Sequence, residues 1–406
     1  MINLPDITTK VISVKLRPKS ERMVKKRHPW IFEDSIVKQS VAANSGDVVV
    51  VYDNKKNKFL ACGLYDPYSP IKIKLVQFGK PAKLDADFFK ARIETIFDIR
   101  KELLETDTNS YRFIYGEADG FPGLIADVYA DVLVVKVYAT IWFPYLNDIL
   151  PHLLDKSNCK TIVLRLSRNV QKSKENHGLK DGQVIYGDLN DNVVLFKEHG
   201  VNFSANVIYG HKTGYFLDHR ENRRRVGELS KGKSVLDVFS YAGGFSVHAL
   251  ANGATEVTSL DISAQALEMA VQNGKLNEYT GTHKTMAVDA FIGLHSLVKE
   301  GKTFDVVVID PPSFAKSAKE VDKAIHSYSR LARLGTSLTA KGGLLILASC
   351  SSRVLADNFF DICEAEIQNG SREFKVIDNT YHDSDHPVIN SFPEGSYLKC
   401  GYYKLD

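Results

Sequence analysis

The amino-acid sequence predicts an α/β protein in which a mostly parallel, doubly wound sheet follows a small β-barrel and a small central α/β unit. Strand and helix patterns alternate regularly in the C-terminal half, which is typical of such a sheet. The first eighty residues instead hold short strand patterns without a long helical period. Since 406 residues exceed one ordinary domain, we expect three domains, over residues 1–80, 81–190 and 191–406.

Residues 1–80 are expected to form the β-barrel, because turn signals separate segments rich in Val, Ile, Tyr and Phe. Strands are expected at Val11–Leu16, Asp47–Tyr52, Phe59–Tyr65 and Ile71–Val76. Within Lys25–Phe32, aromatic residues directly follow positive charge. This order suits RNA, because cations bind phosphates and flat rings stack on bases. The alternative is that Trp30 and Phe32 fill the barrel core, and we expect Phe32 there.

The central unit is expected to combine two helices with a few strands. Apolar residues keep to one side of Asp85–Glu105 at the helical period, and a second helix is expected over Tyr145–Leu154. Strands are expected at Tyr111–Tyr115, Leu124–Tyr129, Val132–Tyr138 and Thr161–Leu166.

The C-terminal half is expected to fold as repeated strand–helix units. Asp218-His-Arg-Glu221 has the pattern of a capping box that opens a basic helix. Strands are expected at Val235–Phe239, Glu256–Asp261, Thr285–Asp289, Asp305–Asp310 and Leu344–Ala348. Helices are expected near Phe245–Ala251, Ser263–Leu276 and Val321–Leu338.

Composition and charge exclude several classes of protein. With 44% apolar and 25% charged residues, the chain is typical of a globular protein, not of a disordered tail or a membrane span. No secretory signal is visible, and the five cysteines form no C-x-x-C pair, so we expect a cytoplasmic protein without a metal site. The net charge is only +3, but basic clusters at Lys10–Arg27 and Arg220–Arg225 suit a phosphate-bearing partner or a solvated face.

Four successive predicted strands of the C-terminal half carry an aspartate at or near their ends: Asp237, Asp261, Asp289 and Asp310. Ligands of such sheets bind at the carboxyl ends of the strands, so these acids predict a negative crevice. S-adenosylmethionine fits it, because its ammonium and sulfonium are cationic and its ribose diol needs a carboxylate acceptor. The pyrophosphate of NAD would be repelled, which makes an oxidoreductase the least favoured enzyme. Each aspartate taken singly could instead cap a helix or form a turn.

Two further segments carry candidate chemistry at the same edge. In Asp310-Pro-Pro-Ser-Phe314 the prolines rigidify the turn after a buried strand, and Phe314 could stack on a base taken out of its helix. Cys350 follows the next strand, so it alone among the cysteines stands where a nucleophile would be useful. The alternative for the Asp-Pro-Pro segment is a plain strand-terminating turn.

Motifs that occur in a characteristic order run along nearly the whole chain. They are His28–Phe32, Gly63–Ser69, Gly116–Leu124, Lys212–Asp218 with Arg220, Asp237–Phe245, Asp310–Lys316, Ser349–Ser351, Asp385–Val388, Phe392–Glu394 and Tyr397–Lys399. In this order and number they resemble the PUA-domain-containing class I S-adenosylmethionine-dependent rRNA methyltransferases, the group that includes the large-subunit rRNA cytosine-C5 enzymes.

The resemblance implies a Rossmann-like class I methyltransferase domain with an N-terminal PUA-like β-barrel and a small central α/β domain. It implies Cys350 as the catalytic thiol, acting with Asp310. The implied cofactor contacts are Lys212, Phe216, Arg220, Asp237, Phe239, Ser240, Tyr241, Gly243, Gly244, Asp261, Ile262, Asp289, Ala290 and Asp310. With the basic clusters, it places RNA contacts at Arg17, Lys25, Lys26, Arg27, Trp30, Arg223, Arg224, Phe314 and Lys316.

The sequence departs from the family pattern in three places. Arg27 stands where the family usually has Gly before His-Pro-Trp, and Lys172–Leu179 departs from the usual Arg-x-x-Glu-Gly-Leu pattern. The Asp-Pro-Pro motif carries Ser313, not the Pro-Cys of two-cysteine RNA cytosine methyltransferases. A scheme for this chain must therefore use one cysteine and another base for product release.

The hypothesis for the reaction is that Cys350 attacks C6 of a flipped cytosine, because C5 is a poor nucleophile until that bond forms. The rivals are methylation of a base nitrogen, with Cys350 structural, and a catalytically inactive RNA-binding protein of ribosome assembly. The expected partner is rRNA of the large subunit or an assembly intermediate of it, with no membrane. The sequence leaves the oligomeric state open, a homodimer included.

Overall fold

The computed structural model describes residue 2 and residues 4–406, and its chain forms two compact units. The first unit contains residues 1–197, 204–217 and 384–395, and the second contains residues 198–203, 218–383 and 396–406. In the part of the chain that is described, no helix is long and apolar enough to cross a membrane.

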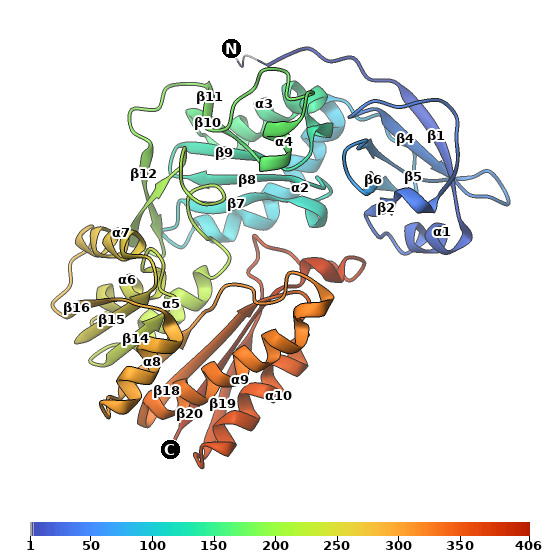
Figure 1. The fold of residues 1–406 in the computed structure, drawn as a ribbon. Coiled ribbons are helices and arrows are strands. Elements are labelled where there is room, and N and C mark those ends of the chain that lie inside the picture. Colours follow the sequence, from blue (N-terminus) through green and yellow to red (C-terminus); the bar gives the residue numbers. More distant parts are fainter. Residues whose placement is uncertain (1, 3) are drawn as a thin grey trace. The chain divides into compact units, whose positions relative to one another are not determined.

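The N-terminal part of the first unit is a six-stranded sheet with one short helix (Figure 1). Its strand order is β2-β6-β5-β4-β1-β3, with β1 parallel to β4 and the other pairs antiparallel. The bounds are β1 Val11–Leu16, α1 Pro18–Lys25, β2 Trp30–Phe32, β3 Ile36–Gln39, β4 Val48–Tyr52, β5 Phe59–Tyr65 and β6 Ile71–Phe78. The basic cluster Lys10–Arg27 thus contains α1, which begins with Pro18 at its first position, where proline is favourable.

Phe32 does not belong to the core of this sheet, contrary to the prediction. Its side chain is 43% exposed, whereas that of Ile31 is 2% exposed. Successive side chains of a strand point to opposite faces, so the short strand β2 can bury only one of two neighbours. Ile31 points to the apolar face of the sheet, and Phe32 therefore points to the other face.

The rest of the first unit contains a five-stranded sheet in the order β11-β10-β9-β8-β7. One core cluster joins side chains of these strands to those of α2 and α3. Asp85 caps α2 by accepting the main-chain N–H of Phe88. The bounds are α2 Ala86–Leu104, β7 Ser110–Tyr115, β8 Leu124–Tyr129, β9 Val132–Val137, α3 Leu146–Ser157, β10 Thr161–Leu166, α4 Arg168–Lys172 and β11 Gln183–Tyr186. The hairpin of β12 (Val193–Glu198) and β13 (Val201–Asn206) follows.

The second unit is built on a seven-stranded sheet in the order β16-β15-β14-β17-β18-β20-β19. The strands from β16 to β18 in this order are parallel, and β20 is antiparallel to both of its neighbours. The strands are β14 Ser234–Val238, β15 Glu256–Asp261, β16 Thr282–Ala287, β17 Phe304–Ile309, β18 Thr339–Cys350, β19 Phe374–Thr380 and β20 Leu398–Leu405. The helices are α5 Arg220–Leu229, α6 Gly244–Ala251, α7 Ala264–Lys275, α8 Ala290–Lys299, α9 Val321–Leu338 and α10 Ala356–Asn369.

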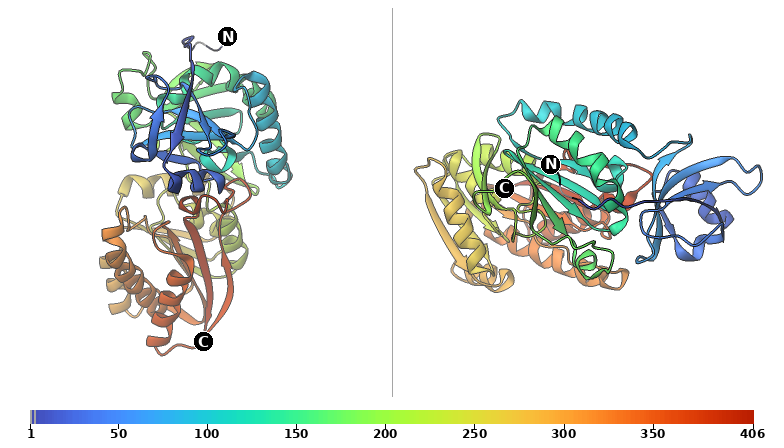
Figure 2. Two further views of the ribbon diagram at one scale, coloured as in Figure 1. Left: turned by 90° about the vertical axis from the view of Figure 1, so that its right-hand side faces the viewer. Right: turned by 90° about the horizontal axis from the view of Figure 1, so that it is seen from above.

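Helices cover both faces of this sheet (Figure 2). Val306 and Val308 of β17 pack in one cluster with α5 and α6, and Val307 and Ile309 pack in the other with α8, α9 and α10. A strand buried on both faces explains the continuous apolar run of β17. The predicted doubly wound α/β architecture is therefore confirmed.

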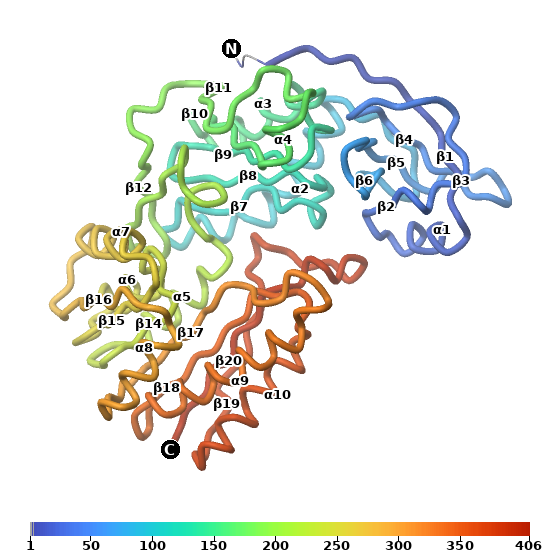
Figure 3. Tube along the Cα trace, viewed as in Figure 1, coloured from blue at the N-terminus to red at the C-terminus, as the bar shows by residue number. Residues whose placement is uncertain are grey.

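Three details differ from the predictions for the C-terminal half. Asp218 and Glu221 form no capping box, because α5 begins after His219, whose side chain makes no capping hydrogen bond. The sheet ends in two antiparallel strands, β19 and β20, that the sequence did not reveal. Between them the chain makes a long excursion (Figure 3). Its residues 384–395 belong to the first unit, where Asp385 accepts the main-chain N–H of Arg112 at 2.9 Å.

Candidate functional site

Four aspartates come together at one edge of the seven-stranded sheet. Asp261 ends β15, Asp237 lies near the end of β14, and Asp289 and Asp310 directly follow β16 and β17. These strands are neighbours and parallel, so their carboxyl ends share an edge. The charges of Asp310 and Asp261 both act on Asp237. The structure thus brings together the acids that the sequence placed at strand ends.

Asp237 is the buried centre of this edge, with 1% of its surface exposed. Its Oδ2 accepts the main-chain N–H of Ser246 at 3.0 Å and the hydroxyl of Ser246 at 2.6 Å. Among the described residues, its Oδ1 has no hydrogen-bond partner. Burial, assisted by the charges of Asp310 and Asp261, raises the pKa of Asp237 to about 7. A buried carboxylate oxygen without a partner is suited to a cationic ligand.

The loop from Phe239 to Gly243 is shaped for close approach of a ligand. Phe239, Tyr241 and Gly243 all have positive φ, at 64°, 49° and 77°. A Cβ at Gly243 would lie 2.7 Å from that of Ala270, so only glycine fits against α7. The hydroxyl of Ser240 is buried and has no partner among the described residues, which gives the site a second polar atom without a protein partner.

Asp261 and Asp289 hold the loops around this edge. The Asp261 carboxylate accepts the main-chain N–H of Tyr241 at 3.0 Å and that of Ser263 at 2.9 Å. Asp289 caps α8 through Oδ1, which accepts the N–H groups of Phe291 and Ile292 at 3.0 and 3.2 Å. Asp261 therefore holds a turn and Asp289 caps a helix. These are the structural roles that the sequence offered as the alternative to ligand binding.

Apolar surface accompanies these acids. Ile262 is 72% exposed and Ile292 is 64% exposed, although both are aliphatic side chains at the edge where the strands end. Ala290, which follows Asp289, is buried. Exposed aliphatic groups beside carboxylates fit a ligand with an apolar ring and a polar diol. The donors and acceptors of this edge thus suit S-adenosylmethionine.

Cys350 ends β18, the strand beside β17, so it shares the edge with Asp310. Its Sγ lies 3.6 Å from the carbonyl oxygen of Pro311, in the Asp-Pro-Pro turn. Burial and the charges of Asp310 and Asp218 raise the pKa of the thiol to about 12. The thiol is therefore protonated in the free protein and must lose its proton to a nearby group if it acts as a nucleophile.

A buried hydrogen-bond network leads to Asp310. Tyr402 and Thr380 donate their hydroxyls to Oδ1 of Asn222, at 2.9 and 2.6 Å. This leaves Nδ2 of Asn222 to donate to Nδ1 of His219, 3.1 Å away. Nε2 of His219 lies 3.3 Å from Oδ1 of Asp310. His219 is therefore oriented with its second ring nitrogen toward Asp310.

Lys399 holds the turn that follows Cys350. Its ammonium is buried and donates to the carbonyl oxygens of Ser351, of Val354 at 2.6 Å and of Tyr397 at 3.2 Å. Burial lowers the pKa of Lys399 to about 8, and the Cys350 sulfur opposes that shift. Three carbonyl acceptors on one ammonium fix the position of the cysteine relative to β20.

Three residues that were predicted to contact the cofactor are not part of the strand ends and loops that carry the four aspartates. Lys212 and Phe216 belong to the first unit, and their contact with the cofactor stays a prediction. Arg220 is fully buried in the second unit and forms an ion pair with Asp383. Its guanidinium therefore stabilises the fold around α5, which the sequence did not indicate.

The predicted RNA contacts of the first unit are at its surface, with one exception. Arg17, Lys25, Lys26 and Arg27 are exposed at α1 and its ends. Lys25 also pairs with Glu21 at 2.5 Å. Trp30 is half-buried, since its Nε1 donates to Glu117 at 3.0 Å and its ring packs edge-on against that of Phe392.

The prediction that Arg223 contacts RNA is wrong. Its guanidinium is 3% exposed and donates two 2.7 Å hydrogen bonds to Glu198, so no nucleic acid can reach it. Arg224, the next residue, is half-buried and pairs with Glu221 and Glu228. Phe314 is half-buried against Tyr328, and Lys316 is exposed.

Sequence reasoning missed three residues that shape the site: Ser246, His219 and Lys399. Ser246 follows Gly244 by two positions and would have been found by asking which N–H groups at the start of α6 face Asp237. Lys399 lies in the Tyr397–Lys399 motif, but neither Lys399 nor His219 received a role from the sequence, because their partners lie far away along the chain.

Comparison with known proteins agrees with the geometry. A model of S-adenosylmethionine-dependent methyltransferases matches residues 187–380, and a model of PUA-like domains matches residues 14–78. The "Ribosomal RNA large subunit methyltransferase" of Deinococcus radiodurans is 42% identical, covering 95% of this chain and 96% of that protein. The "Ribosomal RNA large subunit methyltransferase I" of Shewanella denitrificans is 34% identical, covering 96% and 98%.

Solved structures show the same fold. A protein of Streptococcus mutans, assigned as an S-adenosylmethionine-dependent methyltransferase, has a TM-score of 0.79 at 22% identity and covers 98% of this chain and 100% of its own. A second structure, assigned as a methyltransferase and solved in complex with SAH, has a TM-score of 0.79 at 21% identity with the same coverage.

Proposed function

This chain belongs to the S-adenosylmethionine-dependent methyltransferase family that contains these two relatives, and on that premise we propose that it methylates a base of large-subunit rRNA. The names of relatives that align over almost the whole chain support this substrate. A cytoplasmic location remains a prediction from the sequence, which leaves the oligomeric state open.

The proposed product is 5-methylcytosine, formed through a covalent adduct with Cys350. The main support for this proposal is the position of Cys350 and Asp310. Cys350 ends β18 and Asp310 directly follows β17, and these parallel neighbours share the edge that suits the cofactor. The Cys350 sulfur forms a bond to C6 of cytosine, and the electrons of the C5–C6 double bond make C5 nucleophilic. S-adenosylmethionine, when bound, supplies the electrophilic methyl group. A base then removes the C5 proton and passes it to solvent, which restores the double bond. The departing thiolate takes back the proton held at N3.

Asp310 has a proton to move in this scheme. The Cys350 thiol, with its pKa raised to about 12, can attack only if its proton leaves in the same step. The Asp310 carboxylate, whose charge acts on that thiol, accepts the proton and passes it to N3 of the cytosine. His219 acts through Asp310 as a positioning residue, because its buried Nε2 lies 3.3 Å from one carboxylate oxygen.

The acids at the other strand ends would hold the cofactor. Asp237 and Ser240 offer buried polar atoms, Asp261 an acceptor for the ribose diol, and Asp289 an acceptor for the adenine amine. Gly243 lets the loop that carries Ser240 pack directly against α7. Each of these contacts is part of the proposal.

A Cys350→Ala variant tests the adduct. We expect it to bind S-adenosylmethionine as tightly as the wild type and to form no 5-methylcytosine in rRNA, as read by base-resolved mapping. RNA that contains 5-fluorocytidine provides a second readout, because fluorine at C5 cannot leave as a proton does. The wild type should form a denaturation-resistant complex with it, and the variant none.

Cys159→Ala is the matched control. This thiol is buried in the first unit, and its removal should leave the product unchanged. Wild-type yield of 5-methylcytosine from Cys350→Ala would contradict the adduct.

The raised pKa of Cys350 favours a second candidate, methylation of a base nitrogen. There the Asp310 segment would bind the base, and Cys350 would only pack against the turn. Base-resolved mapping separates the two, because N-methylation gives a different product and leaves Cys350→Ala active.

A further inference from the structure

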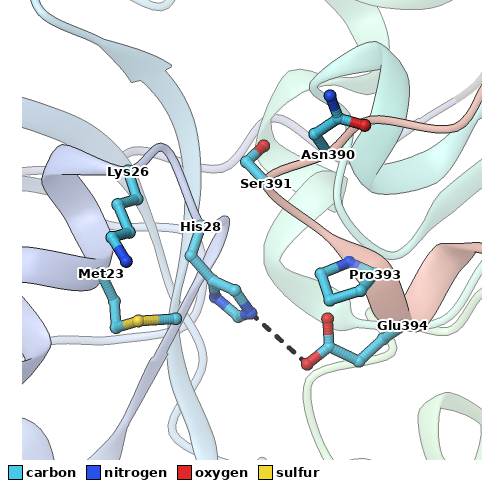
Figure 4. A pocket seen from close by; sticks show the side chains of 7 residues that line it. All are labelled: Met23, Lys26, His28, Asn390, Ser391, Pro393 and Glu394. Carbon is cyan, nitrogen blue, oxygen red and sulfur yellow. Dashed lines mark ion pairs between the residues drawn. The ribbon is translucent and has the colours of Figure 1, made fainter.

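A cleft of about 580 Å³ lies in the first unit (Figure 4), and none of its lining residues belongs to the seven-stranded sheet. Its walls come from the end of α1 and from the 384–395 segment. They are Met23, Lys26, His28, Asn390, Ser391, Pro393 and Glu394. The excursion between β19 and β20 therefore supplies one wall of a polar cleft whose other wall carries the basic cluster.

His28 presents a fixed proton donor to this cleft. Its Nδ1 accepts the main-chain N–H of Trp30 at 3.2 Å, so Nε2 carries the hydrogen of the neutral ring. The ring is 7% exposed and packs edge-on against Trp30 and Phe392, with centroids 6.1 and 6.0 Å away. Since the ring is held on three sides, the direction of the Nε2–H bond is set before any ligand arrives.

Glu394 provides acceptors directly beside this donor. Its Oε1 lies 3.5 Å from Nε2 of His28, longer than an ordinary hydrogen bond, and Figure 4 shows the two groups facing one another. The Glu394 side chain is 47% exposed, so both carboxylate oxygens can accept from a ligand. The cleft thus displays one donor next to two acceptors.

Guanine is the nucleobase whose edge matches this set. Its O6 is an acceptor, and N1–H and the N2 amine are two adjacent donors on the same edge. O6 would accept from Nε2 of His28 while the two donors reach the Glu394 carboxylate. Adenine, cytosine and uracil each present one donor beside an acceptor on that edge, which leaves one carboxylate oxygen without a base donor.

The surroundings suit a nucleotide of an RNA strand. Lys26 lines the cleft, and Arg22 and Arg27 are exposed at the same end of α1. Met23 is 41% exposed and offers an apolar surface for a base, with Pro393 on the other wall. Cations beside an apolar slot are typical of single-stranded RNA sites.

We propose that this cleft binds one unpaired guanosine of the RNA substrate, with its Watson–Crick edge on His28 and Glu394 and its phosphate on Lys26. The proposal rests on the proposed function insofar as the ligand is RNA. It gives the substrate strand a sequence requirement in addition to the methylated base.

Short single-stranded RNAs test it by direct binding to the full-length protein. Four fluorescent nine-nucleotide uridine strands carry guanosine, inosine, adenosine or cytidine at the centre, and anisotropy gives each Kd at fixed salt. We expect guanosine to bind about tenfold more tightly than adenosine or cytidine. Inosine, which lacks the N2 amine, should lose most of that preference.

Variants locate the effect. Glu394→Gln should abolish the preference for guanosine and leave the adenosine strand unchanged, because one carboxylate acceptor becomes an amide N–H donor that opposes a donor of guanine. Glu105→Gln, at an exposed glutamate of the first unit, is the matched control and should keep the preference. Lys26→Ala should weaken all four strands by the same factor.

Equal Kd values for the four strands, or a preference that survives Glu394→Gln, would overturn the proposal. Failure of the proposed function has a different signature. A protein that makes no methylated rRNA but still prefers guanosine through Glu394 would retain this site, and Cys350→Ala should keep the preference.

Discussion

The buried carboxylate of Asp237 is predicted to make cofactor binding depend on pH. Its pKa of about 7 in the free protein means that near neutral pH about half of the molecules carry a proton there. A sulfonium or ammonium is attracted only by the ionised form. Binding should therefore release a proton, and affinity should fall as the pH falls below 7.

The magnitude follows from the fraction of ionised Asp237. With a pKa of about 7, that fraction is about 0.9 at pH 8 and about 0.1 at pH 6. If S-adenosylmethionine binds only the ionised form, its Kd should rise about tenfold from pH 8 to pH 6. At pH 7 each binding event should release about half a proton.

The same shift has the opposite sign for the stability of the free protein. The folded pKa of Asp237 is raised above the ordinary 3.8, so the folded state holds the proton more tightly than the unfolded chain. The contribution of Asp237 to the free energy of unfolding is therefore greatest below about pH 4, and it falls as the pH rises to 7. The total loss is about 4 kcal/mol.

Asp237→Asn should therefore stabilise the free protein while it weakens binding. At pH 8 the variant should gain about 1 to 3 kcal/mol, because the buried charge is gone but the new amide N–H lacks an acceptor. Urea denaturation measures this gain. Calorimetry at pH 6, 7 and 8, in buffers of different ionisation enthalpy, measures Kd and proton release.

Asp322→Asn, at an exposed aspartate of α9, is the matched control and should change neither quantity. The reasoning is refuted if the wild-type Kd is constant between pH 6 and 8, or if Asp237→Asn keeps the full pH dependence.

Three further substitutions have expected effects on stability, each measured by urea denaturation. Gly243→Ala should cost about 2 kcal/mol, because φ is +77° and the new Cβ meets Ala270 at 2.7 Å; a loss below about 0.5 kcal/mol would contradict this. Arg27→Gly should gain about 1 kcal/mol, since φ is +66° just after α1, and an unchanged midpoint would argue against backbone strain there. Glu198→Gln should cost about 3 kcal/mol by leaving a buried arginine without its charge partner, whereas Glu228→Gln on an exposed ion pair should cost under about 0.5 kcal/mol.

The expected effect of Arg27→Gly also explains a departure that was visible in the sequence. Arg27 stands at the position after the end of α1 where the family pattern has glycine. Its N–H donates to the carbonyl of Val24 and that of His28 donates to Met23, which are the two bonds of a Schellman motif. This motif needs a left-handed residue at the position of Arg27, so glycine would satisfy it without strain.

The sequence alone was sufficient to place Asp237, Asp261, Asp289 and Asp310 at one edge of a sheet. Strand and helix periods are local patterns, and in a parallel sheet every strand presents its carboxyl end to the same side. An aspartate near the carboxyl end of each strand therefore had to lie at the same edge as the others. The same reasoning placed Cys350 beside Asp310.

Only the tertiary structure decided which members of a local pattern are buried or paired. Arg223 and Arg224 are adjacent in one basic run, yet Arg223 is buried on Glu198 and Arg224 keeps part of its side chain in solvent. The pKa of Asp237 likewise depends on Ser246 and Asp310, which different elements bring to it. Burial and charge partners arise from contacts between segments far apart in the chain, and these contacts exist only once the chain has folded.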